Sequence, residues 1–206
     1  MIGFYNYTVV LTYIGTMFGF LGLQYIILGQ LKQALLCLMS AGFCDMFDGK
    51  IASTRKRTRQ EKRFGIQIDS LSDFVCFGVL PAQISIHCSE NKKAAIVISL
   101  VYLLGALIRL AWFNVDEEER QTRSKEQREF YLGLPVTATA LILPFLIGIG
   151  SMINIPFAEV SHLLLLLIAI GFLTPFQLRK PHGTGILLLM LVGLTAFAAV
   201  LWGLSA

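Results

Sequence analysis

Long apolar stretches separated by short polar ones fill the chain. At a rise of ~1.5 Å per helical residue, about 20 residues cross the ~30 Å hydrocarbon core of a bilayer. Seven stretches approach or exceed that length: 6–28, 33–53, 65–87, 94–114, 134–154, 161–177 and 184–204. The pattern therefore predicts an all-α integral membrane protein, a polytopic bundle of about seven transmembrane helices.

The composition agrees with this prediction. Hydrophobic residues make up 55% and charged residues 15% of the 206 residues, whereas soluble domains carry about 25% charged residues. Because the apolar stretches occupy most of the chain, no room remains for a separate soluble domain. We expect residues 1–206 to form a single transmembrane domain in a cell membrane.

Basic residues gather in alternate polar loops. With the N-terminus inside, the outer loops hold only Lys32, Lys92 and Lys93. The inner loops hold Arg55, Lys56, Arg57, Arg59, Lys62, Arg63, Arg120, Arg123, Lys125, Arg128, Arg179 and Lys180. Positive charge stays on the cytoplasmic side, so this asymmetry predicts the orientation. No nucleic-acid partner is expected, since the aromatic residues lie inside apolar stretches and are not interleaved with the basic ones.

The predicted spans contain six ionisable residues, which are costly at membrane depth and usually mark a site, a pathway or an ion pair. They are Asp45, Asp48, Lys50, Asp69, Asp73 and Arg109. The aspartates of each span are three or four residues apart, a spacing that places them on one helix face. The two spans are consecutive and antiparallel, joined by a basic loop at 54–64. All four carboxylates are therefore expected at one level, slightly inside the cytoplasmic face.

Four carboxylates in a small volume repel one another unless cations share it. Oxygen ligands suit Mg²⁺ or Mn²⁺, and two such ions ~3.5–4 Å apart can clamp a phosphoryl transfer. Two other interpretations remain open from spacing alone. The aspartates could line a proton or cation pathway, or they could form structural ion pairs with Lys50, Arg55 or Arg109.

Residues 45–73 resemble the signature of the CDP-alcohol phosphotransferase family, D-x-x-D-G-x-x-A-R followed by G-x-x-x-D-x-x-x-D. Here the two parts are DMFDGKIAS and GIQIDSLSD. All four aspartates match, as do Gly49, Ala52 and Gly65. Ser53 stands where the family has arginine, and eleven residues instead of eight separate it from Gly65. Arg55 or Arg57 is expected to replace the missing cation.

Three segments are similar to the phosphatidylserine synthase branch of this family: FGIQIDSLSDFVCFGVLPA at 64–82, RLAWFNV at 109–115 and FYLGLPVTATA at 130–140. The resemblance implies a six-helix family core plus an extra helix, and a homodimer. It also implies transfer of a phosphatidyl group from CDP-diacylglycerol to L-serine with release of CMP. Sister enzymes use other acceptors, such as inositol phosphate or glycerol phosphate, or an archaeal lipid donor. A cation or proton transporter is a remote alternative.

The resemblance also assigns roles residue by residue. Asp45, Asp48 and Asp69 would hold one divalent cation. Asp45, Asp69 and Asp73 would hold a second, and Asp73 would take the proton of the acceptor. The donor would contact Gly49, Ala52, Ser53, Arg55 and Gly65. Arg109 is expected either to neutralise the acidic cluster or to bind the carboxylate of serine.

Overall fold

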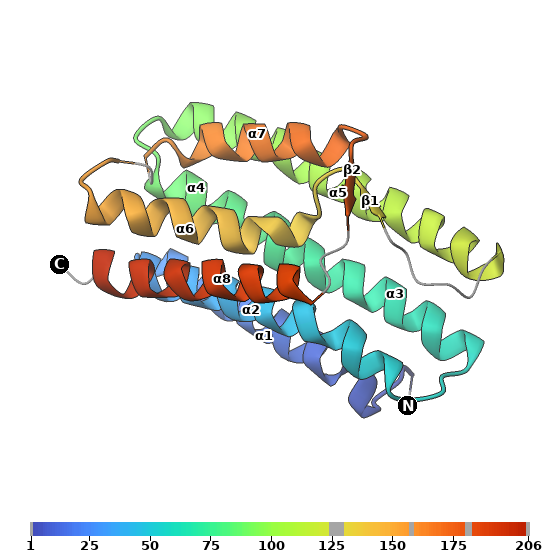
Figure 1. Cartoon of the computed structure of the whole chain (residues 1–206). Coiled ribbons are helices and arrows are strands. Elements are labelled where there is room, and N and C mark those ends of the chain that lie inside the picture. Colours follow the sequence, from blue (N-terminus) through green and yellow to red (C-terminus); the bar gives the residue numbers. More distant parts are fainter. Residues whose placement is uncertain (1, 124–129, 157–158, 180–182, 205–206) are drawn as a thin grey trace.

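The computed structural model describes residues 2–123, 130–156, 159–179 and 183–204. Its helices run side by side along one axis (Figure 1). They are α1 (Val10–Ile27), α2 (Leu31–Ser53), α3 (Arg59–Asp73), α4 (Leu80–Cys88), α5 (Lys92–Arg123), α6 (Thr139–Met152), α7 (Ser161–Leu173) and α8 (Thr184–Gly203). A π-helical turn, η2 (Phe74–Val79), joins α3 to α4, and the short 3-10 turns are η1 (Tyr7–Val9) and η3 (Val136–Ala138).

Because α3, η2 and α4 form one continuous helix, the described residues build seven helical segments, which confirms the predicted polytopic bundle. Four segments are long and apolar enough to cross a membrane: Tyr7–Ile27, Arg59–Cys88, Lys92–Arg120 and Thr184–Gly203. The start of α1 and the end of α8 lie at opposite ends of the bundle (Figure 1). Of the basic residues used to predict orientation, Lys125, Arg128 and Lys180 lie outside the described residues.

Two predicted helix boundaries next to the basic loops were wrong. The α3 helix begins at Arg59, so the predicted loop 54–64 shrinks to 54–58. A capping box causes this early start: Thr58 Oγ1 accepts from Glu61 N at 3.2 Å, and Thr58 N donates to Glu61 Oε2 at 2.8 Å. The α5 helix continues to Arg123, well past residue 114. The capping box therefore extends α3 beyond its apolar stretch, and α5 continues into its polar segment with an ion pair between Glu117 and Arg120.

The sixth predicted span also ends early, because Pro175 disfavours helix at the residue before it and α7 stops at Leu173. A two-stranded antiparallel ribbon, which the all-α prediction did not include, follows. It pairs β1 (Phe130–Leu132) with β2 (Gln177–Arg179). Gly133 closes the ribbon with a φ of 73°. A Cβ there would stand 3.0 Å from the carbonyl oxygen of Thr174, so the close approach favours glycine.

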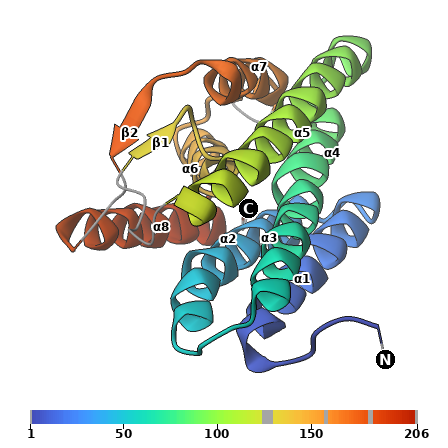
Figure 2. The same cartoon turned by 90° about the vertical axis from the view of Figure 1, so that its right-hand side faces the viewer.

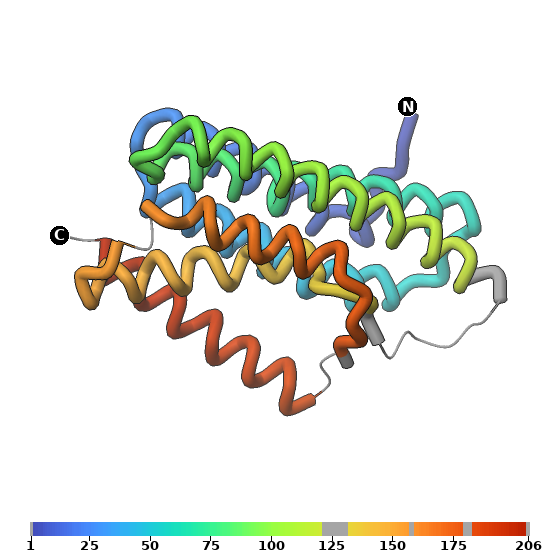
Figure 3. Tube along the Cα trace, turned by 90° about the horizontal axis from the view of Figure 1, so that it is seen from above, coloured from blue at the N-terminus to red at the C-terminus, as the bar shows by residue number. Residues whose placement is uncertain are grey.

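Viewed along the bundle, α1, α2 and α3 lie together on one side, and α6, α7, α8 and the ribbon lie on the other (Figure 2). The α1 helix packs mainly on α2, α5 on α7, and α6 on α8. The last pair meets near the end of α8, where Ser151 Oγ donates to Gly203 O at 2.7 Å. From there the two helices splay apart toward the start of α8 (Figure 3).

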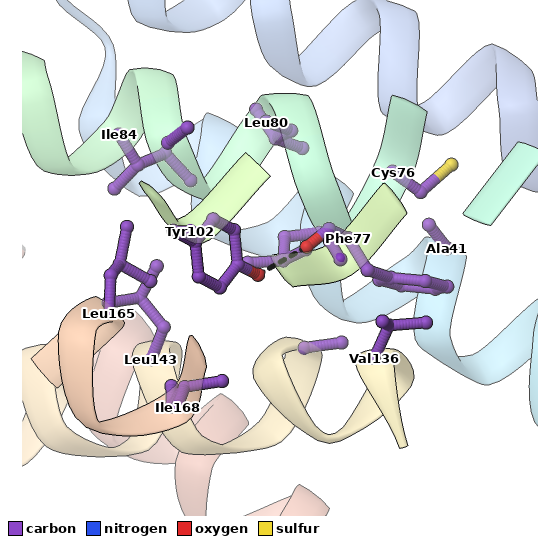
Figure 4. Packing of buried hydrophobic residues seen from close by; sticks show 14 of the residues in the cluster. Ala41, Cys76, Phe77, Leu80, Ile84, Tyr102, Val136, Leu143, Leu165 and Ile168 are labelled. Carbon is purple, nitrogen blue, oxygen red and sulfur yellow. Dashed lines mark hydrogen bonds between the residues drawn. The ribbon is translucent and has the colours of Figure 1, made fainter. Parts of the chain in front are cut away.

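The core lies around Phe77 and Tyr102, which are both fully buried (Figure 4). Pro81 has no N–H, so the carbonyl of Phe77, four residues earlier, loses its usual α-helical partner. The hydroxyl of Tyr102 donates to that carbonyl instead. This bond lets the third span continue through Pro81 and fixes α5 against the helix that carries Asp69 and Asp73.

Candidate metal centre and substrate site

The helices α2 and α3 bring three of the four aspartates into one tight group. Carboxylate oxygens of Asp45, Asp48 and Asp69 all lie within 4.8 Å of one another. Asp73, one helical turn beyond Asp69, lines the same pocket but stands outside this group. It is also the most enclosed of the four, with 8% of its surface exposed. The structure thus groups the three residues that the resemblance assigns to a first cation.

The pocket around these carboxylates is small, with a volume of about 10 Å³, roughly the room for one water-sized sphere. Its other lining residues come from α1, α2, α3 and η2: Leu11, Thr12, Gly15, Ala41, Ser72, Cys76 and Phe77. Clustered carboxylate oxygens are the donors that Mg²⁺ and Mn²⁺ prefer. The donor set and the volume therefore fit an ion held by three carboxylates.

The ion pairs found among the described residues are formed by other side chains. Among the described residues, the ion pairs join Arg55 to Glu61, Arg63 to Glu118 and Arg120 to Glu117, and none involves the four aspartates. The ammonium of Lys50 lies 5.2 Å from the ring of Phe47. The close grouping of Asp45, Asp48 and Asp69 favours a bound cation.

The local helix geometry changes at Asp73. The α-helix ends there and the π-helical turn η2 follows. Such turns insert an extra residue per turn and are frequent at functional sites. Because the insertion rotates all later side chains, Cys76 and Phe77 come to line the pocket. The sequence carried no signal for this turn.

The first span contributes to the pocket, although its sequence was interpreted only as a hydrophobic helix. Thr12 Oγ1 donates to Asp48 Oδ2 at 3.2 Å. A Cβ on Gly19 would stand 2.6 Å from Cys76 Sγ, so the glycine lets α1 approach η2 closely. Small and hydroxyl residues at 12, 15, 16 and 19 recur at helical spacing, a signal that could have revealed the contact face.

A basic hollow of about 480 Å³ lies beyond Asp48, where α2 ends. Its lining residues are Ala52, Ser53, Arg55, Lys56, Arg57 and Lys62. Ser53, at the position of the family arginine, is exposed, and its hydroxyl donates to the carbonyl of Lys50 at 2.6 Å. The hollow is large enough for a phosphate-containing group and carries the charge to attract one.

The two candidate replacement arginines differ in their contacts. Arg55 Nη2 lies 3.6 Å from Glu61 Oε1, which also accepts from Asn6 Nδ2 at 3.0 Å. Arg57 Nη1 instead lies 3.2 Å from the place that a Cβ on Gly65 would occupy. It is also close enough to Asp48 to attract that carboxylate. Arg57 therefore lies against Gly65 of α3, whereas Arg55 is tied to the start of α3 through Glu61.

Two glycines on α2 have opposite surroundings. No atom lies within 4 Å of the Cβ position of Gly49, which is exposed beside Asp48. The Cβ position of Gly42 is 2.7 Å from Ala140 Cβ. Gly42 therefore allows α2 to pack closely against α6, whereas Gly49 leaves open surface next to the aspartates.

Arg109 lies on α5 and is buried, with 6% of its surface exposed. Its Nε donates to the carbonyl of Leu134 at 3.3 Å, and its guanidinium carbon is 5.8 Å from the ring centres of Trp112 and Phe113. Arg109 is not among the described residues that line the carboxylate pocket. Through its bond to Leu134, Arg109 joins α5 to the turn after β1.

Another polar contact links α3 and α5 beside the cluster. Ser70, next to Asp69, donates from Oγ to Asn114 Oδ1 at 2.6 Å. The sequence placed Ser70 and Asn114 in two separate segments, at 64–82 and 109–115, and gave no sign of their contact. The contact joins two of the three segments that resemble the phosphatidylserine synthase branch.

The sequence profile of the CDP-alcohol phosphatidyltransferase family matches residues 5–203. The chain belongs to this family. The matched region covers nearly all of the bundle. It includes α1 and the helices after residue 150, for which the sequence motifs showed no resemblance. No solved structure matches the chain significantly.

Several relatives in the CDP-alcohol phosphatidyltransferase family are named CDP-diacylglycerol–serine O-phosphatidyltransferase. The Mycobacterium bovis protein is 30% identical over 125 residues, 60% of this chain and 42% of that protein. The Helicobacter pylori protein is 25% identical over 156 residues, 74% of this chain and 62% of that protein. The Bacillus subtilis protein is 25% identical over 143 residues, 65% of this chain and 75% of that protein. The chain thus spans less than half the length of the mycobacterial relative.

Proposed function

We propose that this membrane-embedded chain transfers a phosphatidyl group from CDP-diacylglycerol to L-serine, forming phosphatidylserine and releasing CMP. The observation that carries the proposal is the group of Asp45, Asp48 and Asp69 within 4.8 Å beside a basic hollow. A metal centre next to a phosphate-sized basic site is what a phosphoryl transfer requires. The names of the relatives support the choice of donor and acceptor.

In this proposal, Asp45, Asp48 and Asp69 hold one divalent cation, and Asp45, Asp69 and Asp73 hold a second. When bound, Mg²⁺ or Mn²⁺ would neutralise the diphosphate and the charge that develops on the transferred group. The serine hydroxyl oxygen bonds to the phosphorus of the phosphatidyl group, and the bond from that phosphorus to CMP breaks. Asp73 accepts the hydroxyl proton, so no covalent enzyme intermediate is needed.

The donor site is proposed along the end of α2. Gly49 leaves room beside Asp48 for the diphosphate, and Ala52 and Ser53 continue the same surface. Arg57 is favoured as the replacement for the family arginine because it faces Gly65 and Asp48, whereas Arg55 is engaged with Glu61. The diphosphate would then lie between the cations and a guanidinium.

The acceptor site is proposed on the α5 side of the cluster. Serine brings a carboxylate and an ammonium, and an unpaired charge at membrane depth is expensive. Arg109 supplies a cation for the carboxylate. The Ser70–Asn114 pair adds polar groups next to Asp69.

The active site is proposed near the cytoplasmic face, because the basic hollow lies at the end of the bundle that carries most of the inner-loop arginines and lysines. A homodimer is proposed on the resemblance alone. Neither the membrane orientation nor the oligomeric state changes the proposed chemistry.

The deciding experiment measures CMP release by purified protein in detergent micelles with CDP-diacylglycerol and Mg²⁺ or Mn²⁺. L-serine, inositol phosphate and glycerol 3-phosphate are compared at equal concentration, and serine is expected to give the fastest release. Release that follows another acceptor would reject the serine assignment and keep the phosphatidyltransferase. No release with any acceptor or metal would favour an ion pathway through the same aspartates.

A matched pair of arginine variants tests the acceptor site. Arg109→Leu should raise the KM for serine far more than the KM for CDP-diacylglycerol. Arg109→Lys should restore serine use only partly, since lysine lacks the planar bidentate fork. Equal increases in both KM values would indicate that Arg109 stabilises the fold and does not bind serine.

A further inference from the structure

One side of the carboxylate pocket is formed by a hydroxyl residue of α1. Thr12 on α1 is buried, with 7% of its surface exposed, and its hydroxyl donates to Asp48 Oδ2 at 3.2 Å. A buried hydroxyl hydrogen-bonded to a carboxylate fixes the rotation of that carboxylate, because one of its oxygens now has a defined partner. The other oxygen, Oδ1, then points in a defined direction.

The backbone of Thr12 is held in turn by a second set of hydroxyls. Its carbonyl lies 2.8 Å from Thr16 Oγ1 and accepts from Ser72 Oγ at 3.3 Å. Thr16 Oγ1 also lies 2.8 Å from Ser72 Oγ. Ser72 belongs to α3 and stands between Asp69 and Asp73 in the sequence. The hydroxyl cluster of Thr12, Thr16 and Ser72 thus joins α1 to the ligand-bearing turn of α3.

Close helix packing makes this connection rigid. Gly15, which also lines the pocket, has its Cβ position 3.5 Å from Cys44 Cβ on α2, and Cys76 Sγ donates to the carbonyl of Gly15 at 3.3 Å. The α1 helix therefore contacts both aspartate-bearing helices at the level of the pocket.

From these contacts we infer that Thr12 is a positioning residue for the metal centre, which orients the carboxylate of Asp48 for a divalent cation through its hydroxyl. The inference rests on the proposed function only in taking the aspartates as cation ligands. Groups that orient a metal ligand typically change metal affinity by 10–100-fold when removed. Removal of the hydroxyl should therefore weaken cation binding itself, before any substrate is present.

The test measures Mn²⁺ binding to purified full-length protein in detergent, without nucleotide, by electron paramagnetic resonance of the free ion. Thr12→Val, which keeps the shape and removes the hydroxyl, should raise the Kd for Mn²⁺ about tenfold or more. Thr12→Ser should bind close to the unmodified protein. Thr195→Val on α8, where the hydroxyl bonds only to the carbonyl of Val192, is the control and should change nothing.

Asp48→Ala supplies a second measurement that also serves if Thr12→Val folds poorly. Because Thr12 acts through Asp48, Thr12→Ala should weaken Mn²⁺ binding when Asp48 is present but add no further loss to Asp48→Ala. Unchanged binding in Thr12→Val, equal losses in Thr12→Val and Thr12→Ser, or an additive loss with Asp48→Ala would each overturn the inference. So would a failure of the unmodified protein to bind Mn²⁺.

Failure of this inference is separable from failure of the proposed function. Weakened Mn²⁺ binding in Thr12→Val, with no CMP release by the unmodified protein for any acceptor, would support the role of Thr12 and reject the phosphatidyltransferase. Normal CMP release by the unmodified protein, with unchanged Mn²⁺ binding in Thr12→Val, would support the phosphatidyltransferase and reject the role of Thr12.

Discussion

Ser70 on α3 and Asn114 on α5 share a 2.6 Å hydrogen bond one residue away from Asp69. The two residues are 44 positions apart in the chain. Their contact joins the aspartate-bearing helix to the helix of Arg109. The proposed acceptor site on α5 is therefore hydrogen-bonded to the helix that carries the proposed metal ligands.

Ser70→Ala should raise the KM for serine several-fold and leave the KM for CDP-diacylglycerol nearly unchanged. The lost hydrogen bond contributes about 1 kcal/mol, and it lies on the acceptor side only. Asn114→Ala should have a similar effect, and the double variant should cost less than the sum of the two single changes. Ser40→Ala is the matched control, because that hydroxyl only bonds back to Leu36 O. Additive losses would show that the pair does not act as a unit.

Replacing Asp45, Asp48 or Asp69 with asparagine should lower the rate of CMP release at least about 100-fold each, since an amide oxygen is a neutral and weaker ligand. The thermal midpoint in detergent should hold or rise without metal, because each change relieves repulsion between carboxylates. Glu90→Gln, in an exposed loop, is the charge-matched control. Near-normal turnover in any two of the three variants would contradict a shared metal site.

Arg57→Ala should raise the KM for CDP-diacylglycerol about tenfold or more, since a charge-assisted hydrogen bond contributes ~1.5–3 kcal/mol. Arg55→Ala should have a much smaller effect, because Arg55 pairs with Glu61 on the protein. Steady-state CMP release at varied donor concentration separates the two. The opposite ranking would assign the diphosphate to Arg55.

Gly42→Ala and Gly49→Ala should separate packing from substrate contact. The added methyl at Gly42 meets Ala140 Cβ at 2.7 Å and should cost ~1–3 kcal/mol of stability. The methyl at Gly49 meets no atom, so stability should hold or rise, while the KM for CDP-diacylglycerol increases. Thermal unfolding in detergent and donor kinetics check both. A stable, fully active Gly49→Ala would remove that glycine from the donor site.

The basic end of the bundle should face the cytoplasm. In a Cys88→Ala background, which leaves only the buried Cys37, Cys44 and Cys76, Gln60→Cys should resist an impermeant thiol label in intact cells and react after permeabilisation. Lys93→Cys, in the first turn of α5, should react in intact cells. Both positions are exposed in the structure. Labelling in the reverse order would invert the orientation.

The sequence predicted the helical bundle well because the bilayer imposes a simple rule. Backbone polar groups must be satisfied within each segment, so every long apolar stretch becomes a helix. The ends were less predictable, since Thr58, Glu61 and Pro175 set them by local hydrogen bonding and sterics. The short ribbon depends on the pairing of segments 45 or more residues apart, which no local pattern encodes.

For the candidate site, the sequence by itself determined which carboxylates exist, on which helix faces they lie, and that the α2 and α3 aspartates share one level. Helical periodicity fixes those relations within each element. Only the tertiary structure decided that Asp73 lines the pocket outside the tight group of the other three, that Arg57 lies against Gly65 while Arg55 pairs with Glu61, and that α1 supplies Thr12. These depend on the rotation and spacing of helices that pack through small residues such as Gly15 and Gly19. Contacts of that kind form between segments distant in the chain, so spacing along one helix cannot determine them.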